Sequence, residues 1–158
     1  MLNIIGGSYM ENCIDPSSNE LYGSGLRAAA ALSNKGFNIS FYSCISKEYQ
    51  WLAEQKGKTF GYQCTYLTIP LTIEFDYYHP LSFPYRVNYE EDLPIQKIIV
   101  DREGDFLYYG MLEAVAIVNG NYVGYDPQNQ KRFKDRGSTA KHLAIIVNKK
   151  EALFFSKT

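Results

Sequence analysis

Hydrophobic runs separated by glycines divide the first 45 or so residues into a strand, a helix and a second strand. Leu2 to Ile5 is an apolar run that stops at Gly6, a pattern typical of a buried strand that ends in a tight turn. Ser24 to Lys35 is rich in strong helix formers, and Gly36 follows where helix ends favour glycine. Asn38 to Ile45 alternates in polarity and predicts the second strand. Such strand, helix, strand units usually build parallel sheets.

The next part of the chain changes from a helical pattern to a β pattern. Lys47 to Lys56 predicts a short helix that ends at Gly57. Gln63 to Val87 combines β-branched and aromatic residues with three prolines, a spacing that no helix tolerates. We expect two or three edge-type strands there, which form a small sheet projecting from the main body.

Three further strands are predicted at Lys97 to Val100, Phe106 to Tyr109 and Val115 to Val118. The dipeptide Asn119-Gly120 follows the third of them and favours a type I′ hairpin turn. Tyr122 to Tyr125 would then return antiparallel to the preceding strand.

The C-terminal part predicts a strand that lacks neighbours. Gly137 to Ala140 can open a short helix with Ser138 as its cap. Leu143 to Val147 is hydrophobic on both faces, as central parallel strands are, and only the start of a helix from Asn148 follows it. We therefore expect a single partial domain over residues 1–158, in which this interior strand needs neighbours from elsewhere.

Composition is typical of a globular protein and narrows its class. The chain has 158 residues, of which 46% are hydrophobic and 21% charged, and its formal net charge is -1. This charge gives no global field to attract nucleic acid. The three cysteines are odd in number and widely spaced, which fits neither a disulfide framework nor a zinc site. With no membrane-spanning run or signal-peptide pattern in view, we expect a cytoplasmic protein and no membrane contact.

Two segments near the first strand carry groups that could bind a ligand. Gly23-Ser24-Gly25 begins the predicted helix, so its free backbone N–H groups suit an anion or a sugar hydroxyl, although a glycine turn that merely starts the helix explains it too. The chain has no Walker A or dinucleotide fingerprint. Glu11 and Asn12 follow the first strand, where α/β folds place ligand contacts, and the alternative is an acidic surface loop.

Asn148 and Glu151 are a third candidate group. They stand three apart after a buried strand and could orient a metal-bound water near phosphates. The same spacing is that of a helix start with a capping interaction, so both interpretations remain open. His79 and His142 lack metal-ligand spacing and are interpreted as structural or surface residues.

The order of these features resembles the amino-terminal region of ribokinase-like, phosphofructokinase-B type carbohydrate and nucleoside kinases. The matching segments are the opening strand with Gly-Gly-Ser, Gly23-Ser24-Gly25 before an Ala-rich helix and Gly36, Asn38-Ile-Ser-Phe, the lid-like stretch Thr68 to Val87, Asp126-Pro-Gln, Gly137-Ser-Thr-Ala, Leu143-Ala-Ile-Ile-Val and the NxxE motif Asn148 to Glu151. The resemblance implies an α/β fold: a partial Rossmann-like core with a projecting small β-sheet lid, whose strands would lie within residues 63–90.

The resemblance also implies a sugar or nucleoside substrate held between the core and the lid. The substrate-side positions are then Glu11, Asn12, Gly23, Ser24, Gly25 and Arg27, while Asn148 and Glu151 fall on the motif tied to magnesium and phosphate. Relatives usually carry Asn near the position of Arg27. A long cation there would alter an ordinary sugar pocket and would favour a phosphorylated or acidic ligand.

One departure from the family is larger. Members are much longer, and their later half carries the GAGD-type motif with the catalytic Asp, the anion hole and the ATP pocket, none of which occurs here. We therefore predict no catalytic residue in this chain, and expect ATP and magnesium to require a complementing chain. The alternative is a non-catalytic module that binds a small ligand or drives assembly. In either case we expect a homo-oligomer, a dimer through the Tyr-rich lid.

Overall fold

The computed structural model describes residues 1–88, 95–128 and 132–155. Within these ranges the chain has twelve strands, three α-helices and one 3-10 helix, which follow in this order. They are β1 (Leu2–Ile5), β2 (Tyr9–Cys13), β3 (Ser18–Tyr22), α1 (Gly23–Ser33), β4 (Ile39–Ser46), α2 (Lys47–Phe60), β5 (Gln63–Ile69), β6 (Glu74–Tyr77), β7 (Tyr85–Arg86), β8 (Gln96–Ile99), β9 (Gly104–Tyr109), β10 (Ala114–Ile117), β11 (Asn119–Asp126), η1 (Phe133–Arg136), β12 (Thr139–Ile145) and α3 (Lys149–Phe155).

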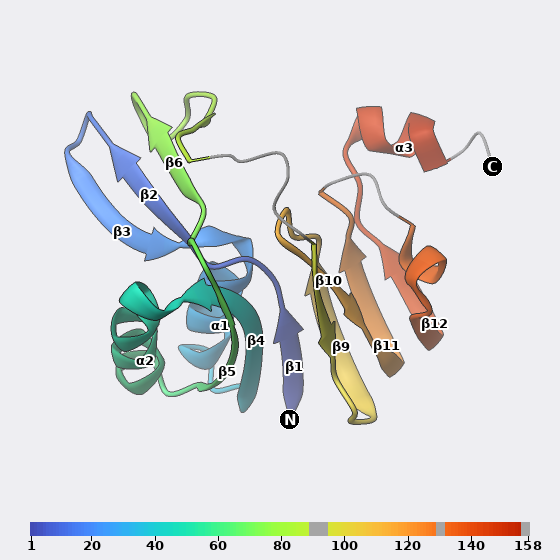
Figure 1. Cartoon of the computed structure of the whole chain (residues 1–158). Coiled ribbons are helices and arrows are strands. Elements are labelled where there is room, and N and C mark those ends of the chain that lie inside the picture. Colours follow the sequence, from blue (N-terminus) through green and yellow to red (C-terminus); the bar gives the residue numbers. More distant parts are fainter. Residues whose placement is uncertain (89–94, 129–131, 156–158) are drawn as a thin grey trace.

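The largest sheet is parallel and has the strand order β12-β11-β9-β1-β4-β5 (Figure 1). The predicted strand, helix, strand unit is confirmed, because β1 and β4 pair in parallel through the α1 crossover. Helices α1 and α2 pack on one face of this sheet. Leu26 and Ala29 of α1 are fully buried there in one cluster with Ile4 and Phe41 of the sheet.

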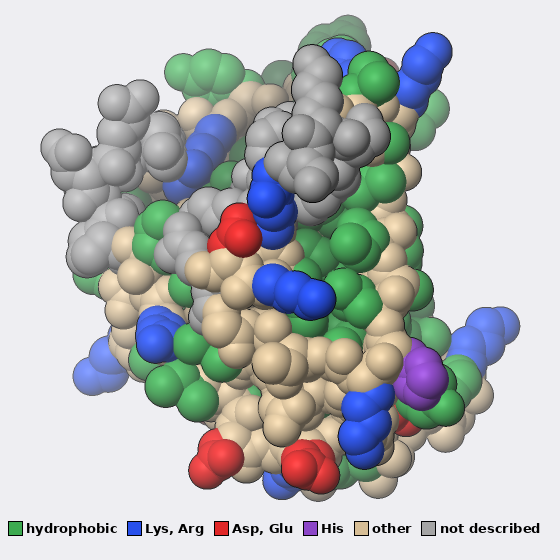
Figure 2. Space-filling model, turned by 90° about the vertical axis from the view of Figure 1, so that its right-hand side faces the viewer, with side chains coloured by type: hydrophobic (Ala, Val, Ile, Leu, Met, Phe, Trp, Pro, Cys, Tyr) green, Lys and Arg blue, Asp and Glu red, His purple; other side chains and the backbone are tan. Residues whose placement is uncertain are grey.

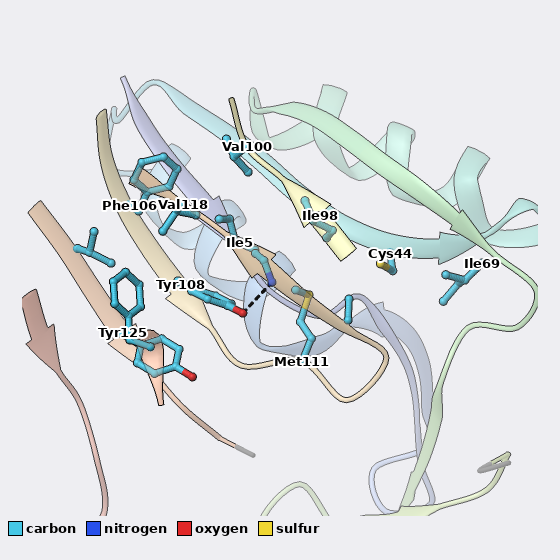
Figure 3. Close-up of a cluster of buried hydrophobic side chains, with 14 residues drawn as sticks. Ile5, Cys44, Ile69, Ile98, Val100, Phe106, Tyr108, Met111, Val118 and Tyr125 are labelled. Carbon is cyan, nitrogen blue, oxygen red and sulfur yellow. Dashed lines mark hydrogen bonds between the residues drawn. The ribbon is translucent and has the colours of Figure 1, made fainter. Parts of the chain in front are cut away.

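The opposite face of the sheet is covered by a two-stranded parallel sheet of β8 and β10. Ile5 packs in the core between the large sheet and the two-stranded sheet, whereas its neighbour Ile4 packs in the core under the helices. Successive strand residues point to opposite faces of a sheet. Phe106 and Tyr108 of the large sheet belong to the same buried cluster as Ile98 of the two-stranded sheet, and Figure 3 shows Phe106 beside Val118 in this cluster. The hydroxyl of Tyr108 accepts a hydrogen bond of 2.8 Å from the backbone N–H of Ala116 and so ties the two layers together (Figure 3).

The predicted Asn119-Gly120 hairpin is wrong. Neither residue has a positive φ, and the chain instead passes from β10 directly into β11, which pairs in parallel with β9 and β12. The glycine serves close packing, because a Cβ at Gly120 would lie 2.3 Å from a methyl of Val123 and 3.1 Å from the ring of Phe106. Tertiary packing thus overrides the local turn preference.

The third sheet has four strands in the order β3-β2-β6-β7 and projects from the large sheet at the upper left of Figure 1. Its hairpin of β2 and β3 was not predicted from the sequence. The expected small sheet from Gln63 to Val87 needs correction, because β5 pairs in parallel with β4 and belongs to the large sheet. The projecting strands in that stretch are β6 and β7, and positions 89 and 90 of the expected lid lie outside the described residues.

Two helix predictions also need correction. Helix α2 continues through Gly57 to Phe60, and Gly61 ends it with a φ of 80°. Gly57 is there for packing, since a Cβ would lie 2.7 Å from the sulfur of Cys64. The helix expected from Gly137 to Ala140 does not form, because β12 begins at Thr139.

Strand β12 is an edge strand of the large sheet and pairs only with β11 among the described strands. Most of its residues are exposed on both faces. Figure 2 views the molecule from the side on which β12 lies and shows hydrophobic side chains at the surface there. The sequence predicted an interior strand, whereas β12 lies at the edge of the sheet among the described residues. Its side chains are mostly exposed to solvent on both faces. No helix among the described residues is both long and apolar enough to cross a membrane.

Candidate functional site

The four-stranded sheet β3-β2-β6-β7, which we call the small sheet, turns one face toward the carboxyl ends of β1 and β9. Side chains alternate along its strands, so Tyr9, Glu11 and Cys13 of β2 share this face. In the paired strand β6, Phe75 and Tyr77 stand opposite Glu11 and Cys13. Loops and turns at the carboxyl ends of parallel strands are where open α/β sheets bind ligands. The inner face of the small sheet therefore forms the roof of a candidate binding site.

Two adjoining cavities lie under this roof. We call the first, of about 310 Å³, the inner compartment; it is lined by Tyr9, Glu11, Gly23, Ser24, Phe75, Tyr77, Pro84, Gly110, Leu112 and Gln128. We call the second, of about 470 Å³, the outer compartment; it is lined by Glu11, Cys13, Ser18, Glu20, Tyr22, Arg27, Tyr77 and Pro80. Glu11 and Tyr77 line both compartments and mark their boundary. Volumes of this size suit small organic ligands.

Glu11 joins β2 to the start of α1. Its Oε1 accepts a hydrogen bond of 2.9 Å from the backbone N–H of Gly23. Its Oε2 forms an ion pair with the guanidinium of Arg27. The same guanidinium lies over the ring of Tyr22, 4.5 Å from its centroid. Arg27 is therefore paired within the chain, and an acidic ligand would have to compete with Glu11 for it.

The glycines in the first turn of α1 allow the helix to approach the end of β1 closely. Gly23 has a φ of 81°, and a Cβ there would lie 2.5 Å from the carbonyl oxygen of Gly7. Gly23 and Ser24 line the inner compartment, whereas Gly25 is buried beneath it. The Oγ of Ser24 is buried and has no hydrogen-bond partner among the described residues, so it is available to a ligand.

Asn12 points away from both compartments. It lies on the other face of β2, where its Nδ2 donates a hydrogen bond of 2.9 Å to Oδ1 of Asp76. Of the six substrate-side candidates, the structure brings four to the cavities, namely Glu11, Gly23, Ser24 and Arg27. Asn12 and Gly25 lie behind the walls of the cavities and do not line them.

Asn148 and Glu151 engage each other as a helix cap. Oδ1 of Asn148 accepts hydrogen bonds from the backbone N–H groups of Lys150 and Glu151, and Oε2 of Glu151 accepts one from the N–H of Asn148. This reciprocal pattern is a capping box. Over the residues that the structure describes, no group of three or more metal-ligating side chains occurs. Asn148 and Glu151 are therefore engaged in capping α3.

Sequence reasoning missed a buried polar pair behind the inner compartment. The hydroxyl of Tyr9 donates a hydrogen bond of 3.0 Å to Oε2 of Glu113 and accepts one of 3.4 Å from the N–H of Leu112. Burial raises the pKa of Glu113 to about 7 and raises the pKa of Tyr9 well above its ordinary value. Oε1 of Glu113 is buried without a hydrogen-bond partner among the described residues. No local motif marks these residues, because contact across 104 positions creates the pair.

Comparisons with known proteins find likeness in structure but not in sequence. No family model matches the chain, and no curated protein sequence does. The microbiome-derived acarbose kinase Mak1 matches with a TM-score of 0.50 and 11% identity over 92% of this chain and 69% of that one. A pyrophosphate-dependent kinase of the ribokinase family, in complex with a pyrophosphate analog and myo-inositol, matches with a TM-score of 0.48 and 12% identity over 80% of this chain and 48% of that one. Tetrameric inhibited phosphofructokinase-2 from Escherichia coli matches with a TM-score of 0.46 and 10% identity over 96% of this chain and 67% of that one.

The match to Mak1 supports the fold class expected from the sequence. The likeness to Mak1 is one of fold, and it agrees with the partial Rossmann-like core and projecting small sheet. The chain spans about half the length of the pyrophosphate-dependent kinases that it matches. Their activities and substrates are therefore not transferred to it by the likeness alone.

Proposed function

We propose that this chain is the substrate-binding and lid portion of a sugar or nucleoside kinase, which transfers phosphate from ATP to a hydroxyl once a C-terminal half completes it. The observation that carries the proposal is the pair of compartments between the small sheet and the carboxyl ends of the large sheet. This arrangement has a binding cavity but, in the described residues, no group of three or more metal-ligating side chains. Phosphoryl transfer needs such positioning and charge stabilisation.

The inner compartment favours an uncharged ligand with hydroxyl groups. Among the described residues that line it, Glu11 alone is charged, and its charge is offset by Arg27. Tyr9, Phe75 and Tyr77 offer ring surfaces, while Ser24 and the Glu11 carboxylate offer hydrogen-bonding atoms. A sugar ring or a ribose meets these demands better than a phosphorylated compound, which would need an unpaired cation.

The uncovered face of the large sheet over β9, β11 and β12 supports the need for a complementing chain. A groove of about 350 Å³ runs over β9, β11 and β12 on the face that α1 and α2 cover elsewhere. Within it the rings of Tyr122 and His142 stack with their centroids 4.6 Å apart. Apolar sheet faces of this kind are normally covered by helices in parallel sheets. We expect a second polypeptide or a further segment to pack here and to pair with the free edge of β12.

The cofactors of the proposal, ATP and magnesium, depend on that complementing half. Magnesium binds through carboxylates together with substrate phosphates, and the Asn148 and Glu151 side chains are engaged in capping α3. A cytoplasmic location also belongs to the proposal. The three cysteines are all free thiols, as expected in a reducing compartment.

Two measurements test this function. The purified chain is incubated with magnesium, ATP or pyrophosphate, and a panel of sugars, inositols and nucleosides, while binding to the same panel is followed by calorimetry. We expect binding without turnover. Robust turnover by the chain alone would refute its incompleteness, and no binding to any compound would refute the substrate-side assignment.

The second candidate function is a non-catalytic module that senses a small ligand or drives assembly. Leu81 and Phe83, the exposed apolar residues at the tip of the small sheet, favour this second function because they suit a contact between chains. Co-purification separates the two candidates. A split enzyme needs a complementing chain with a GAGD-type motif, and a sensor does not.

A further inference from the structure

The outer compartment is a second cavity that a single sugar ring in the inner compartment leaves empty. It has a volume of about 470 Å³ and lies between the β2–β3 hairpin and the exposed side of α1. Ser18 and Glu20 of β3 line it from the hairpin, and Tyr22 and Arg27 line it from α1 and the residue before it. Glu11 and Tyr77 line both cavities, so the two cavities lie next to each other.

The aromatic wall of this cavity is held in place by two cations. The ring of Tyr22 has the guanidinium of Arg27 at 4.5 Å and the ammonium of Lys56 at 4.0 Å from its centroid. Cations over a ring face are attracted to it and limit its motion. This side of the cavity is therefore preorganised before a ligand binds, with the two cations in contact with the ring of Tyr22, which lowers the entropic cost of binding.

The charges around the cavity cancel in pairs. Arg27 pairs with Glu11, and Nζ of Lys56 lies 2.8 Å from Oε2 of Glu20. An anionic group entering the cavity would have to compete with these carboxylates for the two cations, so phosphate is disfavoured. The carboxylates and the guanidinium still have unused hydrogen-bonding capacity, and the hydroxyl of Ser18 adds a donor and an acceptor. This set matches the hydroxyl groups of a neutral polyol.

We propose that the outer compartment binds the second ring of a disaccharide or longer saccharide whose first ring occupies the inner compartment. The inference rests on the proposed sugar-binding function and adds the substrate class. Glu11, at the boundary, can accept hydrogen bonds from both rings. Tyr77 supplies a surface for the apolar C–H face of the second ring.

The test compares monosaccharides with disaccharides that contain the same ring, together with nucleosides, by calorimetry or ligand-observed NMR on the full chain. We expect matching disaccharides to bind at least tenfold more tightly than their monosaccharides. The variant Ser18→Trp places an indole in the outer compartment and should abolish this advantage, measured as the ratio of the two affinities. Ser18 is exposed near the hairpin turn, so the change should not disturb folding.

The matched control is Asn19→Trp. Asn19 is the next residue of β3, is also exposed, and points to the other face of the sheet. It should preserve the disaccharide advantage. Equal affinities for mono- and disaccharides, or an advantage that survives Ser18→Trp, would overturn the inference and leave the proposed function standing. A preference for nucleosides over every saccharide would overturn it as well, whereas no binding to any compound would overturn the proposed function itself.

Discussion

Gly6 and Gly25 pack backbone against backbone, and this contact sets the distance between β1 and α1 under the inner compartment. A Cβ at Gly25 would lie 2.6 Å from both the Cα and the carbonyl carbon of Gly6. Gly25 is completely within the core, in the first turn of α1. The candidate site therefore depends on a pair of residues that have no side chains.

Gly25→Ala is expected to destabilise the fold strongly. Backbone cannot move aside as a flexible side chain can, so we expect the free energy of unfolding to fall by at least about 2 kcal/mol. Urea denaturation measures the change. The control is Gly36→Ala, where φ is 85° but no atom lies within 4 Å of the new Cβ. Only backbone strain of about 1 kcal/mol is expected there. Equal losses in the two variants would contradict the close-contact argument.

Glu11 should contribute to stability more through Gly23 than through Arg27. The side chain of Arg27 is 55% exposed, so Arg27→Ala should cost under about 1 kcal/mol. Glu11→Gln keeps an acceptor for the N–H of Gly23 and should cost a similar amount. Glu11→Ala also leaves that N–H without its partner and should cost about 1 kcal/mol more. Chemical denaturation of the three variants checks this order, and a larger loss in Arg27→Ala than in Glu11→Ala would reverse our interpretation.

The sequence was sufficient for the elements whose cores are built from local patterns. The buried strand Leu2–Ile5, the Ala-rich helix that follows Gly23 and the strand from Ile39 all appear close to their predicted bounds. Their hydrophobic periodicity matches the faces that the fold buries, so local and tertiary preferences agree. The predicted α/β fold class with a projecting small sheet is confirmed for the same reason.

The sequence failed where distant contacts decide the conformation. The Asn119-Gly120 dipeptide is part of β11 because Gly120 packs against the ring of Phe106, where only a residue without a side chain fits. The β2–β3 hairpin does have a local signal, since Asp15-Pro16-Ser17 is a turn sequence between two short segments that pair as antiparallel strands. Tyr9 and Glu113 could not be paired from sequence at all, because nothing local marks residues that meet across the fold.

The tip of the small sheet should mediate the proposed dimer. Leu81 and Phe83 are 90% and 98% exposed and lie between β6 and β7, the edge strand of that sheet. Large exposed apolar side chains beside an unpaired strand edge favour association between chains. We expect Leu81→Lys with Phe83→Lys to halve the mass measured by light scattering. Trp51→Lys, which removes an exposed aromatic residue from α2, is the control and should leave the mass unchanged. An unaltered dimer in the double variant would place the interface elsewhere.

Glu113 should make the protein less stable as the pH rises from 5 to 8. Its pKa in the folded protein is raised from 4.5 to about 7, chiefly by burial. Between these values the folded state holds a proton that the unfolded state has released, so folding is favoured at the acidic end and the advantage is lost toward pH 7. At about 1.4 kcal/mol per pKa unit, the change is on the order of 3 kcal/mol. Unfolding measured across this range checks it.

Two variants at this pair distinguish titration of Glu113 from other causes of pH dependence. Glu113→Gln cannot titrate, so its stability should stay flat from pH 5 to 8 and exceed that of the wild type at pH 8. Tyr9→Phe removes a hydrogen bond that favours the carboxylate and lowers its pKa. The loss of stability in Tyr9→Phe should then be centred at a higher pH than in the wild type. If Glu113→Gln kept the full pH dependence, another group would have to carry it.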